Sequence, residues 1–343
     1  MRPHPLRVTA VVAGAAVLAG ATVACDRGST ASESEIGIDL PRSDSDFWNS
    51  YARYTKRYVS TQDIHALPIT NSRNSVGRLV FNVRAFESMG AKAIVMAPQD
   101  TGAITPTLSQ LASKHIPVVS VDTRPESGKV YMVVRGDNRA YGTKACEFLG
   151  KQLGGKGEVA ELEGALDSIN GRDRTEAFNA CMKKNFPGIT VHPLATDWDG
   201  AVAYVKLKAL LAEHPDINGI YMQAGGAFLQ PTLSLLEEKG LLKPAGSAGH
   251  ITIVSNDGIP QEYAEIRRGH IDATVSQPAD LYAKYALYYA KAAASGKTFK
   301  PGPTDHGSTI VQLPNGLEDQ LPAPLVTKTN VDDDTLWGNN ISN

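Results

Sequence analysis

From residue 36 to about residue 300 the chain alternates regularly between two kinds of segment. Short apolar runs are typical of buried strands, and between them apolar residues recur every three or four positions, as on one face of a helix. Strands alternating with helices predict an α/β fold of parallel sheets covered by helices on both faces. The expected strands are 36–40, 63–69, 92–98, 117–122, 131–136, 158–164, 189–195, 219–224, 251–257 and 271–277, and the clearest helical segments are 75–90, 201–215 and 281–296.

The alternation divides near Asp137 into two series, which indicates two doubly wound domains rather than one very wide sheet. A chain of 343 residues is long enough for two cores. We assign residues 36–136 with 278–303 to an N-terminal lobe and residues 137–277 with 304–328 to a C-terminal lobe. The polar tail after them, residues 329–343, is expected either to strap across the domains or to fray.

The N-terminus precedes this pattern and differs from it. Arg2 and Arg7 form a basic start, and residues 8–24 carry no charge. This composition predicts a secretory signal peptide over residues 1–24, with a single-pass membrane anchor as the alternative. Removing that segment leaves a formal net charge of −4 and no basic stripe, so nucleic acid is not an expected partner.

Cys25 follows small residues and precedes a polar tract, an arrangement that resembles the lipobox of bacterial lipoproteins. Thr22 stands where a large aliphatic residue is usual. We expect Cys25 to be acylated and residues 25–35 to be a tether to the outer face of the cytoplasmic membrane. The alternative is an ordinary signal followed by an incidental cysteine. Both readings place the mature protein outside the cytoplasm.

The other two cysteines, Cys146 and Cys181, fall on apolar stripes of predicted helices. In an oxidising compartment they are candidates for a disulfide, and two separately buried thiols are the alternative.

Common catalytic and cofactor motifs do not occur in the sequence. Residues 150–156 have the spacing of a phosphate-binding loop, but Gly157 stands where Ser or Thr is needed. The eight histidines are scattered, and HExxH, CxxC and G-x-S-x-G are all missing. We therefore expect no catalytic residue, no cofactor and no metal site built on local spacing.

Polar residues follow strand after strand at the point where each strand ends. In doubly wound domains these carboxyl ends face the cleft. Carboxylates there would accept hydrogen bonds from hydroxyls, arginine and amides would donate, and the aromatic rings of Phe47, Trp48 and Trp198 would cover a C–H surface. This set suits a neutral polyhydroxyl ligand. The strand-end candidates are Asp122, Asp137, Asn138, Arg172, Arg174, Asp197, Trp198, Asn256, Asp257 and Gln277.

Arg172 and Arg174 are unexpected within this set, because we place both in the first turn of a helix, where the macrodipole disfavours cations. A role in the cleft would explain Arg174. The role of Arg172 is left open.

An ordered set of short motifs carries a family resemblance. The motifs are IGIDL with a downstream DFW, IPVVSVDT, RGDNRAYG, NGRDRTEAF, TDWD, HPDINGIY, IVSNDG and ATVSQP. With them, residues 36 to 328 resemble the ribose/galactose type of bacterial sugar-binding protein of ABC importers, the type 1 periplasmic binding proteins. The resemblance implies two doubly wound parallel-sheet domains joined by a three-segment hinge. It also implies a monomer that binds a monosaccharide, deoxysugar or polyol without catalysis and delivers it to a membrane permease.

The resemblance further implies which residues form the site. Trp198 would cover the ligand face opposite Phe47 and Trp48, the two aspartates would accept from hydroxyls, Arg174 would donate, and Gln277 would bond near the hinge. The full expected set is Phe47, Trp48, Asp122, Arg124, Asn138, Arg174, Trp198, Asp257 and Gln277.

At three places this chain departs from the polar groups that the family usually has in the site. Ala97 replaces an asparagine, Ala224 and Gly225 replace an Asn-Asp pair, and Thr123 separates Asp122 from the arginine that directly follows it in ribose binders. A buried hydroxyl without a partner costs about 1 to 3 kcal/mol, so ribose itself is not expected. A ligand with a less polar edge, or one bonded by Gln99 or Gln223, fits better.

Transport has three alternatives. A cytoplasmic repressor would need an N-terminal helix-turn-helix, whose place the signal segment takes. An extracytoplasmic sugar sensor that presents its ligand to a membrane receptor would use the same cleft. A carbohydrate-active enzyme would need two carboxylates flanking the scissile bond, which Asp122 and Asp257 could mimic.

Overall fold

The computed structural model describes residues 1, 3, 4 and 35–340. The predicted acylation site Cys25 and nearly all of the signal and tether segments lie outside the described residues. Within the described part of the chain, no helix has both the length and the apolar character that crossing a membrane would require.

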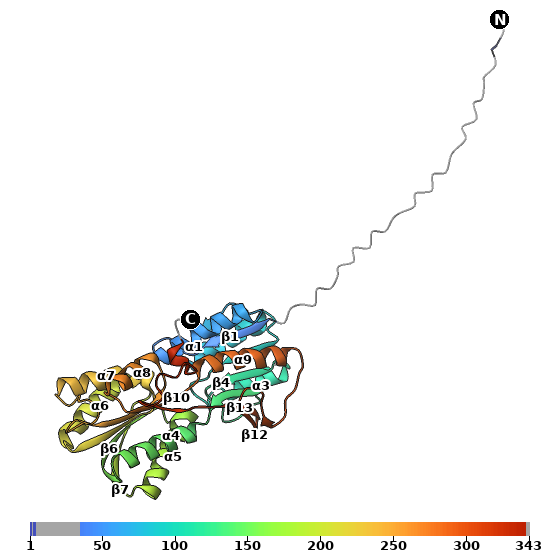
Figure 1. The fold of residues 1–343 in the computed structure, drawn as a ribbon. Coiled ribbons are helices and arrows are strands. Elements are labelled where there is room, and N and C mark those ends of the chain that lie inside the picture. Colours follow the sequence, from blue (N-terminus) through green and yellow to red (C-terminus); the bar gives the residue numbers. More distant parts are fainter. Residues whose placement is uncertain (2, 5–34, 341–343) are drawn as a thin grey trace. The chain divides into compact units, whose positions relative to one another are not determined.

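The first sheet has eight strands in the order β11-β12-β13-β5-β4-β3-β1-β2. Figure 1 shows α9 next to β4 of this sheet. Side chains that alternate along β3 and β4 reach both faces of this sheet: Val95 and Val119 pack with α1 and α9, whereas Ile94 and Val118 pack with α2 and α3. We call this sheet with these four helices the first lobe. Its elements are β1 Ile36–Leu40, α1 Asp46–Thr61, β2 Thr70–Asn71, α2 Val76–Ser88, β3 Ala93–Met96, α3 Thr105–Ser113, β4 Val118–Val121, β5 Met132–Gly136, α9 Ala279–Ala294, β11 Gly302–Pro303, β12 Thr309–Leu313 and β13 Gly316–Leu321.

The second sheet has six strands in the order β14-β10-β9-β8-β6-β7. Val159 packs with α4 and α5 on one face, and Ala160 packs on the other face in the cluster that contains the apolar side chains of α6, α7 and α8. We call this sheet with these five helices the second lobe. Its elements are α4 Asn138–Gln152, β6 Lys156–Glu163, α5 Ile169–Asn185, β7 Gly188–Ala195, α6 Gly200–Glu213, β8 Ile217–Met222, α7 Gly225–Glu238, β9 Thr252–Asp257, α8 Pro260–Arg268, β10 Ala273–Ser276 and β14 Leu325–Thr327.

The predicted fold class is confirmed. Pairing is parallel within both sheets except where β11, β12 and β14 take part. The chain passes between the sheets after β5, after β10 and after β13, and these passages are the three connections between the lobes.

One expected lobe assignment is wrong in part. The expected C-terminal lobe includes all of residues 304–328, but β12 and β13 belong to the eight-stranded sheet. β13 pairs in parallel with β5, with Glu318 opposite Val133, so that the third connection lies between Leu321 and Leu325. Only β14 joins the second sheet.

The predicted strand at residues 63–69 is also wrong. This segment makes a single bridge, from Ala66 to Ile36, and regular pairing with β1 begins only at Thr70. Pro68 has no N–H to donate to a ladder, which accounts for the irregular backbone.

The C-terminal tail is a strap as far as residue 340. The buried Trp337 lies in a short 3₁₀ helix, Trp337–Asn339, labelled η1. Its indole Nε1 donates to the backbone oxygen of Asp257 in the second lobe (3.3 Å), and its own backbone oxygen accepts from the Tyr54 hydroxyl in the first lobe (3.1 Å).

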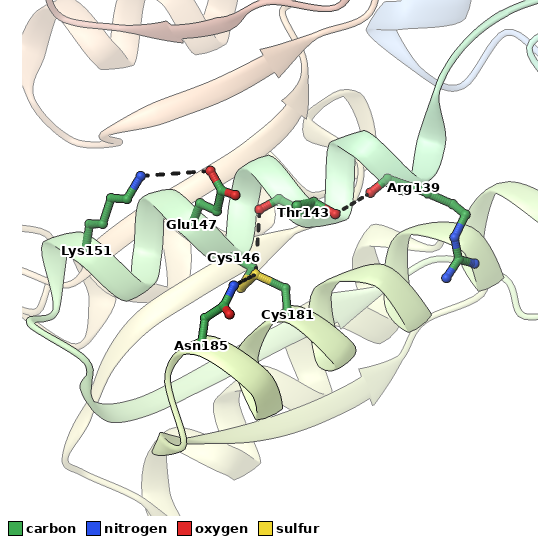
Figure 2. The surroundings of a disulfide bond; sticks show 7 residues. All are labelled: Arg139, Thr143, Cys146, Glu147, Lys151, Cys181 and Asn185. Carbon is green, nitrogen blue, oxygen red and sulfur yellow. Dashed lines mark hydrogen bonds and ion pairs between the residues drawn. A yellow bond between two sulfur atoms is a disulfide. The ribbon is translucent and has the colours of Figure 1, made fainter.

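Cys146 and Cys181 form a disulfide in the structure (Figure 2). It joins α4 to α5, two helices packed side by side on one face of the second sheet. The same pair of helices carries Asn138 and Arg174, so the covalent link holds together the elements that position two candidate site residues.

Candidate ligand-binding site

A cavity lies between the two lobes where strands of both sheets end. It is lined by side chains from the start of α1, from α5 and from the residues that end or follow β4, β7, β9 and β10. Ligands bind at this edge in doubly wound sheets. The structure brings seven of the predicted site residues to this cavity: Phe47, Trp48, Asp122, Arg174, Trp198, Asp257 and Gln277.

Arg174 is the buried cation of the cavity, with 2% of its surface exposed. It lies in the second turn of α5, one turn later than the sequence predicted. Its Nε donates to Asn138 Oδ1 (2.7 Å), its Nη2 donates to Gln277 Oε1 (3.0 Å), and its Nη1 donates to the backbone oxygen of Gln223. The guanidinium carbon lies 5.6 Å from the ring centroid of Trp198. These contacts fix the charge in place before any ligand arrives.

Asp122 lines the cavity and has one carboxylate oxygen without a partner in the described residues. Its Oδ2 accepts from Asn170 Nδ2 (2.8 Å), whereas its buried Oδ1 has no hydrogen-bond partner among residues 35–340. Burial raises the pKa of Asp122, and the nearby guanidinium groups of Arg174 and Arg135 oppose that rise. A buried acceptor without a partner is costly, and a ligand hydroxyl that donated to Oδ1 would remove this cost.

Asp257 is held on both oxygens. Oδ2 accepts from the backbone N–H of Gly226 (2.7 Å), and Oδ1 accepts from Gln277 Nε2 (2.6 Å). Burial raises the pKa of Asp257, and the charge of Arg174 opposes this rise. Gln277 therefore bridges the carboxylate and the guanidinium, accepting from Arg174 and donating to Asp257.

Aromatic side chains form two walls of the cavity. Phe47 and Trp48 lie at the start of α1 with their rings edge to face, centroids 5.1 Å apart. Trp198, on the second lobe, stacks against Phe228 at 6.5 Å and an angle of 10°. Gly164 makes room for Trp198, because a Cβ at Gly164 would lie 2.0 Å from the indole ring. Such flat apolar faces suit the C–H surface of a sugar or polyol.

The backbone is strained at three of the lining residues. Asp122, Trp198 and Asp257 have φ values of 61°, 61° and 122°. Non-glycine residues rarely adopt positive φ, and such conformations concentrate at ligand sites, where the surrounding structure enforces them. Strain at three positions of one cavity supports a binding role for it.

Two predicted residues are not among the described residues that line this cavity. Arg124 lies 3.9 Å from a carboxylate oxygen of Asp173 and is one-third exposed. Thr123, which takes the place next to Asp122, lines the cavity instead. Asn138 is buried behind Arg174 and accepts from its Nε, so it positions the arginine rather than facing the cavity.

Sequence reasoning missed several lining residues: Arg42, Ser45, Ser168, Asn170 and Ala227. Asn170 is the most informative of them, because it joins Asp122 to Arg135, donating to the first and accepting from the second (3.0 Å). Its position two residues before the RDR motif could have identified Asn170 as a site residue from the sequence. Arg135 lies inside β5 and gave no such signal.

The two lobes touch across the mouth of the cavity. Arg172 of α5 forms an ion pair with Glu126 of the first lobe, and Gln261 Nε2 donates to Asp46 Oδ2 (3.1 Å). At Gly226 of α7, an added Cβ would lie 2.8 Å from Ser45 Oγ and 3.1 Å from the backbone nitrogen of Phe47. Arg172, whose role was left open, therefore bridges the lobes.

The cavity is small. Its volume is about 40 Å³, in a measure where one water needs roughly 10 to 15 Å³. A second cavity of about 270 Å³, lined by Asp100, Asp167 and Asp197, shares Gln99 and Trp198 with it. The cavity of about 40 Å³ therefore suits a compact ligand rather than an oligosaccharide.

Comparison with known proteins gives a consistent result. A family model described as a periplasmic binding protein domain matches residues 36–298. The ribose import binding protein of Bacillus subtilis is 26% identical over 266 residues, which cover 77% of this chain and 83% of that protein. The xylitol-binding protein of Mycolicibacterium smegmatis is 26% identical over 333 residues, which cover 95% of this chain and 87% of that protein.

A solved structure shares the fold. An ABC transporter solute binding protein from Mycobacterium smegmatis, with bound glycerol, matches with a TM-score of 0.75 at 23% identity, covering 87% of this chain and 95% of that one.

Proposed function

Because this chain belongs to the periplasmic binding protein family, we propose that it is the extracytoplasmic solute-binding protein of an ABC importer. Its ligand is a small polyol or monosaccharide, bound in the cavity between the lobes and delivered to a membrane permease. Relatives named for ribose import and for xylitol binding support this ligand class.

One observation carries the proposal. The fixed donor Arg174 and the unpartnered acceptor oxygen of Asp122 meet in one cavity between the aromatic walls of Trp48 and Trp198. A hydroxyl is both donor and acceptor, so neighbouring hydroxyls of one ligand can satisfy both kinds of group at once. A neutral ligand also suits a cavity whose carboxylates already lie beside an arginine.

The preferred class of ligand follows from the polar groups that the cavity walls lack. Ala224 and Ala227 line the cavity with side chains that form no hydrogen bond to a hydroxyl. A ligand with fewer hydroxyls on that side, such as a polyol or a deoxysugar, leaves fewer buried hydroxyls unpaired. We propose this class ahead of ribose.

We propose binding without catalysis. Both oxygens of Asp257 are held by Gly226 and Gln277, which leaves this carboxylate poorly placed to act as a nucleophile or to activate water. Unchanged ligand after prolonged incubation, checked by chromatography, is the expected result.

The test is a thermal-shift screen of the purified protein against pentoses, hexoses, deoxysugars and linear and cyclic polyols, with calorimetry on each hit. A ligand with micromolar Kd at millimolar concentration adds about 4 kcal/mol to the free energy of unfolding. We expect a selective rise in Tm and a 1:1 stoichiometry. A flat response across all these classes would refute the proposed ligand class.

The hit is assigned to the cavity with matched variants. Asp122→Asn is expected to weaken binding by about 1 to 3 kcal/mol, because the amide nitrogen cannot accept from a hydroxyl. Asp334→Asn makes the same chemical change at an exposed position in the tail and is expected to leave Kd unchanged. Equal effects of the two substitutions would place the ligand elsewhere.

We also propose that the protein is a monomer anchored by a lipid on Cys25. Mass spectrometry of the protein from its native membrane is expected to find the N-terminus at acylated Cys25, and Cys25→Ser is expected to release the protein into the medium. An unmodified thiol on the membrane-extracted protein would contradict acylation.

A further inference from the structure

A second cluster of ligand-competent side chains lies on the second lobe, among residues that do not line the cavity. It consists of Glu158 on β6, His192 on β7 and His214, the residue that directly follows α6. Their ligand atoms all lie within 4.8 Å of one another, and among the described residues no other group of three or more histidines, cysteines and carboxylates meets that condition. We propose that these three residues bind a divalent transition-metal ion, with Zn²⁺ as the best-suited ion.

The geometry is close to that of a zinc site. His192 Nε2 lies 3.0 Å and His214 Nδ1 lies 3.1 Å from the same oxygen, Oε2 of Glu158. In a tetrahedral site with metal–ligand bonds of about 2.0 to 2.2 Å, neighbouring ligand atoms lie roughly 3.3 Å apart. The two histidine nitrogens need to move only a few tenths of an ångström away from Oε2. The ring centroids, now 4.3 Å apart, need to separate to roughly 5 Å to admit the ion.

The fold brings the three residues together from distant parts of the sequence. β6 and β7 are neighbours, and their register places His192 opposite Ala160, two residues beyond Glu158 on the same face of the sheet. This is the face on which α6 packs, and His214 follows the last residue of that helix. Spacings of 34 and 22 residues form no local motif, which explains why the sequence gave no sign of a metal site.

Local irregularities fix the backbone of Glu158. The pairing of β6 with β8 shifts register between Glu158 and Val159, where Asn218 is the extra residue. Asn218 Oδ1 accepts from the Glu158 N–H (3.0 Å), and Gly157 (φ 138°) leaves room for the asparagine side chain. This bulge lies in β8 and brings the Asn218 side chain against the Glu158 backbone.

The surroundings favour an exchangeable cation. The side chains of Glu158, His192 and His214 are 26%, 18% and 38% exposed, so an ion can enter and a water can take the fourth position. The C-terminal end of α6 carries the negative end of the helix macrodipole. Two imidazoles and one carboxylate match zinc and its neighbours, whereas Ca²⁺ and Mg²⁺ prefer all-oxygen sites.

The ion would join β6, the edge strand β7 and the end of α6. Edge strands expose unpaired backbone groups and are open to unwanted pairing. Bound zinc would brace this edge, at a place whose residues are separate from those of the ligand cavity. Metal binding and ligand binding can therefore be measured independently.

The test is calorimetric titration of the chelator-treated protein, purified without a polyhistidine tag, with ZnCl₂. We expect one Zn²⁺ per chain with a Kd on the order of micromolar or tighter, and a rise in Tm of a few degrees at a hundredfold excess over Kd. Titration with MgCl₂ or CaCl₂ is expected to give no binding at the same concentrations. Failure of Zn²⁺ to bind at a 1:1 ratio would overturn the proposal.

The ion is assigned to the cluster with variants. His192→Ala, His214→Ala and Glu158→Gln should each weaken zinc binding by at least the roughly 10- to 100-fold that loss of an outer-shell partner costs. The matched control is His270→Ala, which removes a histidine paired with a single carboxylate, Glu265, at 2.7 Å. Zinc binding that survives in all three cluster variants would place the ion elsewhere and overturn the assignment.

Two further readouts guard against misfolding. The cluster variants are expected to keep the metal-free Tm of the parent within a few degrees, and substitution with Co²⁺ is expected to give the intense visible absorption of a four-coordinate ion. A weak, six-coordinate Co²⁺ spectrum would contradict the tetrahedral site.

Discussion

Arg174 lies among groups that each need its charge or its N–H donors. Asn138, Gln277 and the backbone oxygen of Gln223 accept from it, and the two cavity aspartates lie near its charge. Arg174→Ala is expected to weaken ligand binding by about 2 to 5 kcal/mol, because its partners would stay buried and unpaired. Calorimetry with the ligand found by screening measures this change.

Two further substitutions in α5 serve as comparisons for Arg174→Ala. Arg174→Lys keeps the charge but lacks the planar fork, so most of the loss is expected to persist. Arg172→Ala removes an arginine that is 31% exposed and is expected to cost at most about 1 kcal/mol. A smaller loss at position 174 than at 172 would remove Arg174 from the binding site.

At the residue scale, the site residues that could be predicted from the sequence are those at the ends of strands. Asp122, Asp257 and Gln277 directly follow or end apolar runs, so their place at the cleft could be read from the sequence. Arg135 could not, because it lies inside the buried strand β5 and reaches Asn170 only through the packing of the lobes. Arg124 does not line the cavity, because Thr123 takes the position next to Asp122 and lines it instead.

The disulfide acts at the scale of two helices. It closes a loop with a sequence separation of 35, which in the chain-entropy account corresponds to roughly 3 to 4 kcal/mol. The double variant Cys146→Ala/Cys181→Ala is expected to lose about 2 to 4 kcal/mol of unfolding free energy in urea denaturation. Added reductant should destabilise the parent protein and leave the double variant unaffected; equal sensitivity of both would contradict the assignment.

Glu161 in β6 makes stability depend on pH. Burial, and then the charge of Glu163, raise the pKa of Glu161 to about 8. Because this is above the pKa in the unfolded chain, the fold favours the protonated acid. The stability it contributes is complete below about pH 4.5 and is lost as pH rises through 8.

Glu161→Gln is therefore expected to flatten the fall in unfolding free energy between pH 5 and pH 9. The acid accepts from Asn179 and Gln223, and an amide can keep one of these bonds while the other partner flips. Urea denaturation of both proteins at several pH values measures the difference. Parallel pH profiles would show that Glu161 does not cause the dependence.

At the element scale, long helices and fully buried parallel strands were predictable from periodicity alone. The strands β12 and β13 were not, because their burial alternates irregularly and β5, the strand with which β13 pairs in parallel, lies far away in sequence. The Asn315-Gly316 pair between them is a typical hairpin signal, and it was the one local clue. Chain order alone could not place this hairpin in the first sheet.

Closure of the two lobes depends on the close approach at Gly226. A Cβ there would lie 2.8 Å from Ser45 Oγ and 3.1 Å from the Phe47 backbone nitrogen, so alanine would hold the lobes apart. A ligand that prefers the closed form then loses affinity. Gly226→Ala is expected to weaken binding at least tenfold, mainly through faster dissociation, measured by stopped-flow fluorescence of the cavity tryptophans.

The control for Gly226 is Gly77→Ala in α2, where the nearest atom to an added Cβ is 3.9 Å away. It is expected to leave both rate constants unchanged. X-ray scattering with saturating ligand should show a more open Gly226→Ala protein than the parent; identical profiles would mean that the approach at Gly226 does not govern closure.

The insertion of β13 beside β5 has a consequence for how the protein is made. β5 ends at Gly136 and its partner begins at Gly316, so about 180 residues must be synthesised between them. At typical translation speeds this takes roughly 10 to 40 s. For that time one edge of β5 has no neighbour, and the entire second sheet except β14 is translated before the first sheet can be completed. Wherever the chain folds, its second sheet can therefore form before its first sheet is complete, and a chaperone that shields the open edge of β5 would act at that stage.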